Sequence, residues 1–203
     1  MLSPWWDRRG WAIPAQANLS GRKDRAGLGG LDEGRMEFCP MPAAQLPRME
    51  MSRAERLEDE TLIRLIMQYH DAHVRDLASA AHTAEIVAAR HGPESGFPPA
   101  LPDELARLRE TLQAHQLREE AVLFPVILEG RGETLRYPIK ALGSEHDDMQ
   151  DGLERLVRLT GDYAAPAGAC ATWRALYDLL RKFDGEFREH VRLEERVLFP
   201  RFQ

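Results

Sequence analysis

Four stretches of the chain place apolar residues three and four positions apart, and this pattern constrains the fold more than any other feature. In an α-helix such spacings bring the apolar side chains onto one face, so each stretch predicts an amphipathic helix. The stretches start near Leu62, Leu105, Ile139 and Trp173, and the sequence from residue 53 onward lacks strand signals. Four such helices with short or moderate loops predict an all-α protein, an antiparallel up-down four-helix bundle.

Glycine and proline mark the expected helix ends. The first helix should stop near His91-Gly92-Pro93, and the second should begin at Pro102. Gly130 and Gly132 close the second helix, and Gly161 follows the third. Proline lacks the amide hydrogen that a helix interior needs, and glycine leaves the helical conformation easily, so these residues limit each helix.

Residues 1–52 differ in composition from the rest of the chain. They hold 11 glycines and prolines, against 17 in the remaining 151 residues, and no apolar period persists through them. Such a segment has little apolar surface to bury, so we expect residues 1–52 to form a disordered or weakly ordered N-terminal tail. Residues 53–203 are then the folded helical bundle.

Charge and hydropathy exclude several classes of protein. The net charge is −6, and the residues after 52 carry 20 basic and 27 acidic side chains without a basic block, so nucleic acid is not an expected partner. No apolar run approaches the roughly 20 residues that cross a bilayer, and no continuous apolar stretch near the start indicates secretion. We therefore expect a cytoplasmic protein without a membrane span. Cys39 and Cys170 are too few for a disulfide scaffold or a four-thiolate metal site.

Every apolar stripe carries histidine on the face that should point inward. His70 and His73 lie on the first stripe, and His115, His146 and His190 lie on the other three. A single buried histidine is usually a hydrogen-bonded core residue, so one alone carries little information. Histidine on each of four facing helices predicts a cluster at the centre of the bundle.

Two stripes add a glutamate four residues after the histidine, Glu119 and Glu194. Because four residues of α-helix turn the chain about 40° past a full turn, each glutamate shares a face with its histidine. The adjacent Glu120 and Glu195 are about 140° from the histidine and should face solvent or a neighbouring helix. A buried glutamate without a partner costs several kcal/mol, so histidines and glutamates together favour a metal site over a purely structural core.

The pattern occurs twice along the chain. Segments 115–125 and 190–200 are identical at 7 of 11 positions, and His70-Asp71 resembles His146-Asp147. Two such helical hairpins predict a pseudo-twofold axis with a pair of metal ions at its centre. Imidazole and carboxylate ligands without thiolate suit iron, manganese or zinc. If both glutamates bridge the two ions, and one oxide or hydroxide also bridges the ions, each ion keeps an open position for a diatomic molecule.

From about Glu60 to Phe202 the sequence resembles the di-iron iron–sulfur cluster repair proteins of the hemerythrin-like superfamily. The shared motifs are Tyr69-His70-Asp71-x-His73, His115-x-x-x-Glu119-Glu120-x-x-Leu123-Phe124-Pro125, Ser144-Glu145-His146-Asp147, and His190-x-x-x-Glu194 with Val197-Leu198-Phe199-Pro200. The resemblance implies two iron ions in a non-haem, oxo- or hydroxo-bridged di-iron centre. The ligands it implies are His70, His115, Glu119, His146, His190 and Glu194, with both glutamates bridging.

Two residues near this motif set have open roles. The resemblance implies that His73 is not usually a ligand, which leaves it as a hydrogen-bond donor beside the site, a spare ligand, or a partly buried core histidine. Glu145 lies either at the entrance to the metals or on an ordinary helix surface.

The resemblance also frames the function. It implies a protein of nitrosative or oxidative stress response that repairs or maintains iron–sulfur clusters by donating iron or handling nitric oxide, with damaged iron–sulfur proteins as clients. Family members commonly carry an N-terminal module with an adjacent Cys-Cys pair, whereas residues 1–52 hold only Cys39. One alternative is a hemerythrin-type carrier or sensor of dioxygen, in which His73 would supply a fifth histidine. The other is an interaction module with structural metals. The sequence leaves the oligomeric state open.

Overall fold

The computed structural model describes residues 46, 48–91 and 96–203, and within these ranges the chain is mostly helical and contains no strand. In chain order the elements are α1 (Met51–Ala54), α2 (Asp59–His91), α3 (Leu101–Arg118), η2 (Glu119–Leu123), α4 (Phe124–Leu128), η3 (Gly132–Thr134), α5 (Arg136–Thr160), α6 (Ala171–Leu193), η4 (Glu194–Leu198) and η5 (Phe199–Phe202). No helix in the described part of the chain is long and apolar enough to cross a membrane.

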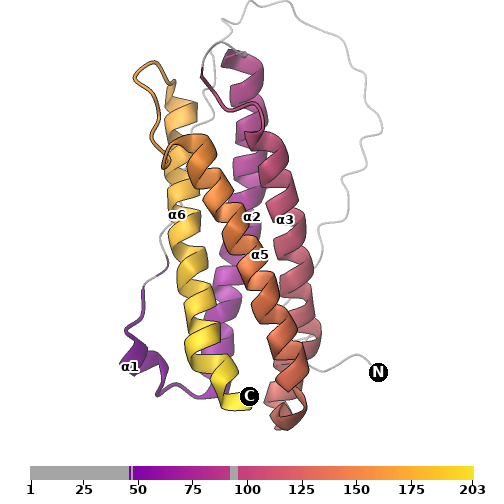
Figure 1. The fold of residues 1–203 in the computed structure, drawn as a ribbon. Coiled ribbons are helices and arrows are strands. Elements are labelled where there is room, and N and C mark those ends of the chain that lie inside the picture. Colours follow the sequence, from indigo (N-terminus) through magenta and orange to yellow (C-terminus); the bar gives the residue numbers. More distant parts are fainter. Residues whose placement is uncertain (1–45, 47, 92–95) are drawn as a thin grey trace, which may run out of the picture. The chain divides into compact units, whose positions relative to one another are not determined.

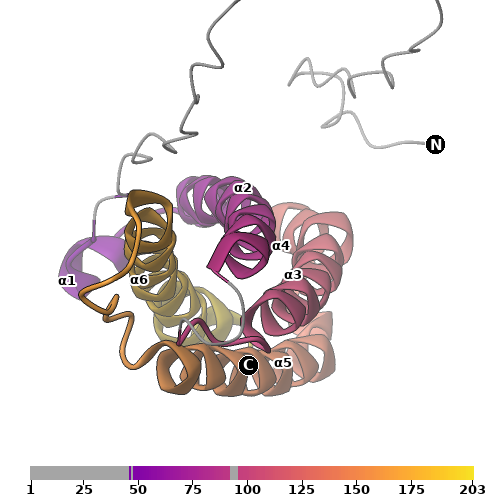
Figure 2. The same ribbon diagram turned by 90° about the horizontal axis from the view of Figure 1, so that it is seen from above.

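Four long elements form a bundle: α2, α3 with its continuation through η2 and α4, α5, and α6 (Figure 1). Seen end-on, they surround a central axis in the order α2, α3, α5, α6 (Figure 2). Each element runs opposite to the one before it in the chain, as expected when connections join neighbouring helix ends. The antiparallel up-down four-helix bundle predicted from the sequence is therefore confirmed.

The helix ends agree with the glycine and proline signals. Helix α2 ends at His91, and the Gly-Pro stop after it lies in residues 92–95, outside the described residues. Helix α5 ends at Thr160, where Gly161 has a φ of 59°, a left-handed conformation that glycine adopts without strain. The Cys170 sulfur caps the start of α6 by accepting a hydrogen bond from a first-turn amide. Cys170 is therefore a helix cap with a free thiol rather than part of a disulfide.

A polar layer divides the apolar core into two clusters. One cluster includes Leu77, Leu112, Leu153 and Phe187. The other includes Leu62, Leu123, Ile139 and Val197. On every long helix the inward histidine lies at the border between these two clusters. The bundle therefore encloses its polar centre between two apolar regions that keep water away.

Part of the segment predicted as a tail contacts the bundle. Residues 1–45 lie outside the described residues, but Leu46 N–H donates to Glu186 Oε1 at 2.8 Å. Arg192 donates in turn to the Met49 carbonyl at 2.8 Å. Side chains of α6 thus hold the described end of the segment against that helix, while the expected division between tail and bundle stays a prediction.

A buried ion-pair triad ties α6 to α2. Lys182 Nζ donates to Asp76 Oδ2 at 2.7 Å and to Glu186 Oε2 at 2.8 Å. The side chains of Asp76 and Glu186 are 7% and 4% exposed, so water and salt screen these charges little. Removing the lysine would leave two buried carboxylates uncompensated, which costs more than losing a surface ion pair.

We expect Lys182→Met to lower the free energy of unfolding by about 3–5 kcal/mol, as for other broken buried ion pairs. The control Arg64→Met removes the exposed pair of Arg64 with Glu60 and should cost no more than about 1 kcal/mol. Urea unfolding followed by circular dichroism measures both variants. Equal losses would show that the triad contributes no more than a surface pair.

Candidate metal centre

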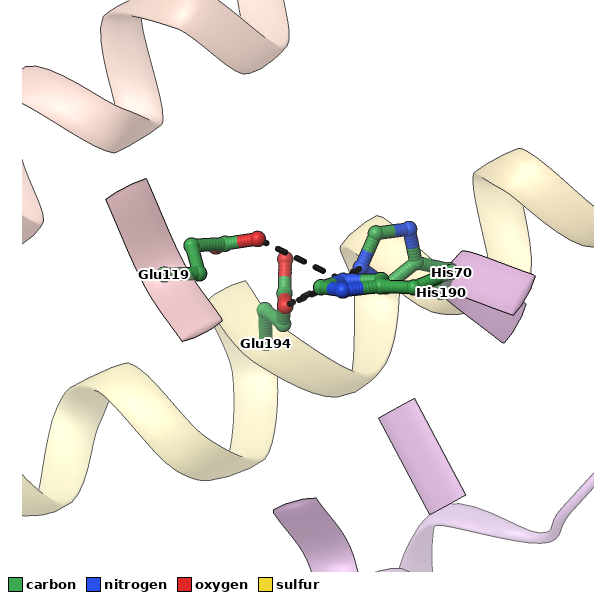
Figure 3. Close-up of side chains that lie close together, drawn as sticks. All are labelled: His70, Glu119, His190 and Glu194. Atoms are coloured by element: carbon green, nitrogen blue, oxygen red, sulfur yellow. Dashed lines mark hydrogen bonds and ion pairs between the residues drawn. The ribbon is translucent and has the colours of Figure 1, made fainter. Parts of the chain in front are cut away.

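The structure brings the six predicted metal ligands together in the middle of the bundle, each no more than 1% exposed. They come from all four long elements: His70 from α2, His115 from α3, Glu119 from η2, His146 from α5, His190 from α6 and Glu194 from η4. They form two overlapping groups, and the ligand atoms within each group all lie within 4.8 Å of one another. One group pairs His70 with His190, the other pairs His115 with His146, and both contain the two glutamates. In Figure 3 the imidazole rings of the first group lie close to both carboxylates.

In each group the two imidazole rings direct the same nitrogen toward a common point. His70 Nε2 and His190 Nε2 are 3.1 Å apart, and His115 Nε2 and His146 Nε2 are 2.9 Å apart. Two nitrogens bound about 2.1 Å from one ion, at an angle near 90°, would be about 3 Å apart. The spacing of each pair therefore fits one cation.

The two glutamates reach both groups. Glu194 places Oε1 3.0 Å from His190 Nε2 and Oε2 3.1 Å from His146 Nε2. Glu119 Oε2 lies 3.4 Å and 3.3 Å from the Nε2 atoms of the histidines on α2 and α3. Each carboxylate thus lies between the two imidazole pairs, as a bridging ligand would.

The carboxylate oxygens provide a test of whether the cluster fits metal ions. Both oxygens of Glu119 and both oxygens of Glu194 are buried, and imidazole Nε2 atoms lie 3.0–3.4 Å from these two carboxylates. A buried carboxylate without compensation costs several kcal/mol, so the cluster needs positive charge from cations or from protons on the histidines. Oxygen and nitrogen donors without thiolate fit iron, manganese or zinc.

In the metal-free cluster, protons on the histidines supply positive charge. Burial by itself lowers the pKa of His70, but hydrogen bonds with Glu120 and Glu194 outweigh burial and raise the pKa to about 10. Burial also lowers the pKa of His146, and hydrogen bonds with Glu194 and Glu195 raise it to about 10. Both imidazoles are therefore protonated near neutral pH until a cation displaces their protons.

His190 and the two buried glutamates respond differently to the same environment. Burial lowers the pKa of His190 to about 4, against the attraction of Glu194. Burial and the neighbouring charge of Glu194 raise the pKa of Glu119. Burial would also raise the pKa of Glu194, but the charge of His190 and hydrogen bonds from the surrounding histidines hold it well below its ordinary value. Near neutral pH the metal-free cluster therefore keeps Glu194 as an anion and His190 as a neutral imidazole.

Two π-helical turns carry the glutamates. The turn Glu119–Leu123 ends with Phe124 N–H bonded to the Glu119 carbonyl five residues back, and Glu194–Leu198 ends in the same way. Pro125 and Pro200 follow these turns, and each proline can neither donate to the carbonyl four residues earlier nor fit against it. The helix therefore widens to a π turn, a feature that is common at functional sites. The side-chain directions predicted from the sequence hold for a regular α-helix and do not include these turns, which the repeated Phe-Pro pair indicates.

Three further glutamates hold the outer nitrogens of the predicted ligands. Glu120 Oε1 accepts from His70 Nδ1 at 2.9 Å, and Glu195 Oε1 accepts from His146 Nδ1 at 3.1 Å. Both therefore face a neighbouring helix, which is one of the two orientations expected from the sequence. The wider turn brings them there, because successive residues of a π turn are separated by a smaller rotation than those of an α-helix.

Glu145 contacts the site through its second carboxylate oxygen. Its Oε2 accepts from His115 Nδ1 at 2.8 Å and from Arg118 at 2.6 Å. Burial raises the pKa of Glu145, but hydrogen bonds from Arg118 and His115 lower it below its ordinary value. A carboxylate at the outer nitrogen fixes the tautomer and the orientation of a ligating imidazole. The side chain is thus a support for His115 rather than an ordinary surface residue.

His73 lies beside the cluster but outside both groups. It is fully buried, and neither of its ring nitrogens has a hydrogen-bond partner among the described residues. Its ring centroid is 5.2 Å from that of His190 and 5.2 Å from that of Phe183. Burial and the charges of nearby cationic groups lower its pKa well below the ordinary value, so the ring is neutral. This position fits a core histidine next to the site more closely than a ligand.

The arrangement matches a known family over most of the chain. Residues 61–202 match the model of the hemerythrin HHE cation binding domain. The chain belongs to the hemerythrin HHE family. As a hemerythrin HHE domain it contains a cation-binding site, and the buried cluster of histidines and glutamates fits that site.

Curated relatives carry a more specific name. The chain is 37% identical over 142 residues to the iron-sulfur cluster repair protein YtfE of Dickeya chrysanthemi, which covers 70% of this chain and 64% of that protein. It is 39% identical over 137 residues to the protein of the same name from Yersinia pseudotuberculosis, which covers 68% of this chain and 62% of the relative. The chain thus spans less than two thirds of the length of these relatives.

Because both glutamates lie between the imidazole pairs, Glu119→Ala or Glu194→Ala should lower the metal content well below two ions per chain. The control Glu110→Ala changes an exposed glutamate on α3 and should keep the full content. Metal analysis after loading with Fe²⁺ measures the effect, and circular dichroism checks that each variant is helical. Full metal content in the Glu119 and Glu194 variants would contradict their assignment as ligands.

Metal binding should release protons near neutral pH. The metal-free protein holds protons on His70 and His146 up to about pH 10, and a cation at Nε2 must displace them. Affinity should therefore rise with pH from neutral toward that value. Calorimetric titration of chelator-treated protein with Zn²⁺ in two buffers of different ionisation enthalpy measures the protons released. Binding without proton release would mean that both imidazoles are already neutral.

Proposed function

We propose that this chain holds two iron ions at the buried cluster and serves in repair or maintenance of iron–sulfur clusters under nitrosative or oxidative stress in the cytoplasm. The observation that carries the proposal is the pair of overlapping groups, each with two imidazoles, that share two buried glutamates. This donor arrangement offers one site for each of two ions, joined by the carboxylates of Glu119 and Glu194.

The choice of iron follows from the donor set and the relatives. Nitrogen and oxygen donors suit iron as well as zinc or manganese, and curated relatives are named iron-sulfur cluster repair proteins. When bound, an iron pair supplies redox chemistry and positions at which nitric oxide or dioxygen can bind. The chain's own residues hold the ions, neutralise their charge and surround them with apolar side chains.

In this proposal iron is also the cargo delivered to damaged iron–sulfur proteins. Four imidazoles and two shared carboxylates form a site with fewer oxygen donors than the carboxylate-rich sites of ferritin-like proteins, so the ions are held less tightly. Cys39 is the only cysteine in the sequence of residues 1–52, and it lies outside the described residues. The repair role proposed here therefore rests on the bundle alone.

Dioxygen carriage is less well supported. A fifth histidine ligand would have to be His73, and His73 lies outside both groups of converging ligand atoms. The other alternative is an interaction module whose metals are structural. Reversible dioxygen binding by the reduced protein would favour the carrier, and full function of a folded metal-free protein would favour the interaction module.

The proposal predicts that iron-loaded protein restores activity to an iron–sulfur enzyme damaged by nitric oxide, in the presence of cysteine desulfurase and cysteine. Recovery should exceed that given by His190→Ala, because His190 supplies an imidazole to one iron site, and a chelator should suppress it. Glu110→Ala should behave like the wild type. Equal recovery with wild type and His190→Ala would remove the metal centre from the mechanism.

A further inference from the structure

The four histidines of the cluster differ in what holds their outer nitrogens. The Nδ1 atoms of three of them donate to carboxylates: His70 to Glu120, His146 to Glu195 and His115 to Glu145. His190 is the exception, because its Nδ1 is buried and has no hydrogen-bond partner among the described residues. The His115–His146 pair therefore has two supporting carboxylates, whereas the His70–His190 pair has one.

The surroundings of His190 explain why no carboxylate supports it. Its ring is stacked on Tyr69 at 6.2 Å and lies 6.0 Å from Phe187 and 5.2 Å from His73, measured between ring centroids. His73 contributes neither of its nitrogens to a hydrogen bond within the described part of the chain. Aromatic rings thus surround His190, whereas each of the other three imidazoles has a carboxylate at its Nδ1 atom.

The difference can be followed to one position of the internal repeat. Tyr69-His70-Asp71 corresponds to Glu145-His146-Asp147 in the second half. Glu145 reaches across to the histidine of α3, whereas Tyr69, in the matching position of the first half, stacks on the histidine of α6. A tyrosine in place of a glutamate therefore breaks the pseudo-twofold symmetry outside the ligands themselves.

A carboxylate on the outer nitrogen raises the basicity of a ligating imidazole and locks the tautomer that presents Nε2 to the metal. Removing such a partner typically weakens metal binding about 10- to 100-fold. His190 must keep its Nδ1 proton without an acceptor when Nε2 faces a cation, so it is the weakest of the four imidazole ligands.

We propose that the two metal positions are unequal, with the ion between His70 and His190 released first and the ion between His115 and His146 retained. The inference rests on the proposed function in taking iron as the metal. It adds that a chain delivers one iron readily while the other continues to neutralise the shared glutamates. Glu120, Glu145 and Glu195 are then positioning residues that set the release rate of the ion nearest to each.

Chelation kinetics test the inequality on the full chain. Protein loaded without oxygen to two Fe²⁺ per chain is mixed with excess ferrozine, and the coloured complex is followed with time. We expect two phases of equal amplitude whose rates differ about tenfold or more, as for loss of one supporting partner. A single phase would overturn the proposal.

Matched variants distinguish unequal sites from equal sites that merely lose their ions one after the other. Glu120 and Glu195 occupy corresponding positions of the repeat and have similar side-chain exposure, 30% and 37%. Glu195→Gln should accelerate the slow phase about tenfold and leave the fast phase unchanged, and Glu145→Gln should do the same. Glu120→Gln should accelerate only the fast phase. Identical behaviour of Glu120→Gln and Glu195→Gln, or the opposite assignment, would overturn the proposal.

Two further measurements keep this result separate from the proposed repair function. Glu110→Gln is the control for a glutamate away from the cluster, and circular dichroism with metal analysis confirms that each variant is folded and fully loaded before mixing. The same preparations are tested in the repair assay. Two assigned phases without repair would refute the function and keep the inequality, whereas repair with one phase would refute the inequality alone.

Discussion

Burial of charge at the centre of the bundle is the constraint on which the rest of the structure depends. Six ionisable side chains are removed from water between two apolar clusters, and the shared carboxylates face the imidazoles of the cluster at 3.0–3.4 Å. Such a cluster is stable only if cations or protons supply positive charge and if the imidazoles are held in the right orientation. The four helices supply the histidines, the π turns carry the glutamates, and the outer carboxylates orient the imidazoles.

Each half of the internal repeat contributes the same set of residues to the cluster. Each half supplies one histidine from a first helix and a histidine with a glutamate from a second, so a bundle of four helices encloses two imidazole pairs. Pro125 and Pro200 impose the same π turn in both halves, which lets two adjacent glutamates act in one site. One glutamate of each pair faces the centre, and the other supports a histidine of the neighbouring helix.

The two halves of the repeat are not identical around the metal site. Tyr69 stands where the second half has Glu145, and His73 stands where the second half has Met149. Both differences lie around His190, which is therefore the least supported imidazole of the cluster. Membership of the hemerythrin HHE family describes the common part of the site.

The sequence by itself determined the four helices and the identity of the six clustered residues. The helices and the inward histidines and glutamates follow from apolar periodicity and from the four-residue spacing within one helix. The choice of His70 over His73 came from the resemblance to a known family. For Glu120 and Glu195 the sequence left two orientations open, toward solvent or toward a neighbouring helix. Their partners lie on other helices, and the π turn changes the direction of their side chains.

Only the tertiary structure decided which nitrogen of each histidine faces the centre, which carboxylate supports it, and that residues near Leu46 lie against α6. These contacts join residues far apart in the chain, and their geometry depends on how the helices are rotated against one another. Spacing along a single helix carries no information on that rotation, so the unequal support of His190 emerges only when all four helices are packed together.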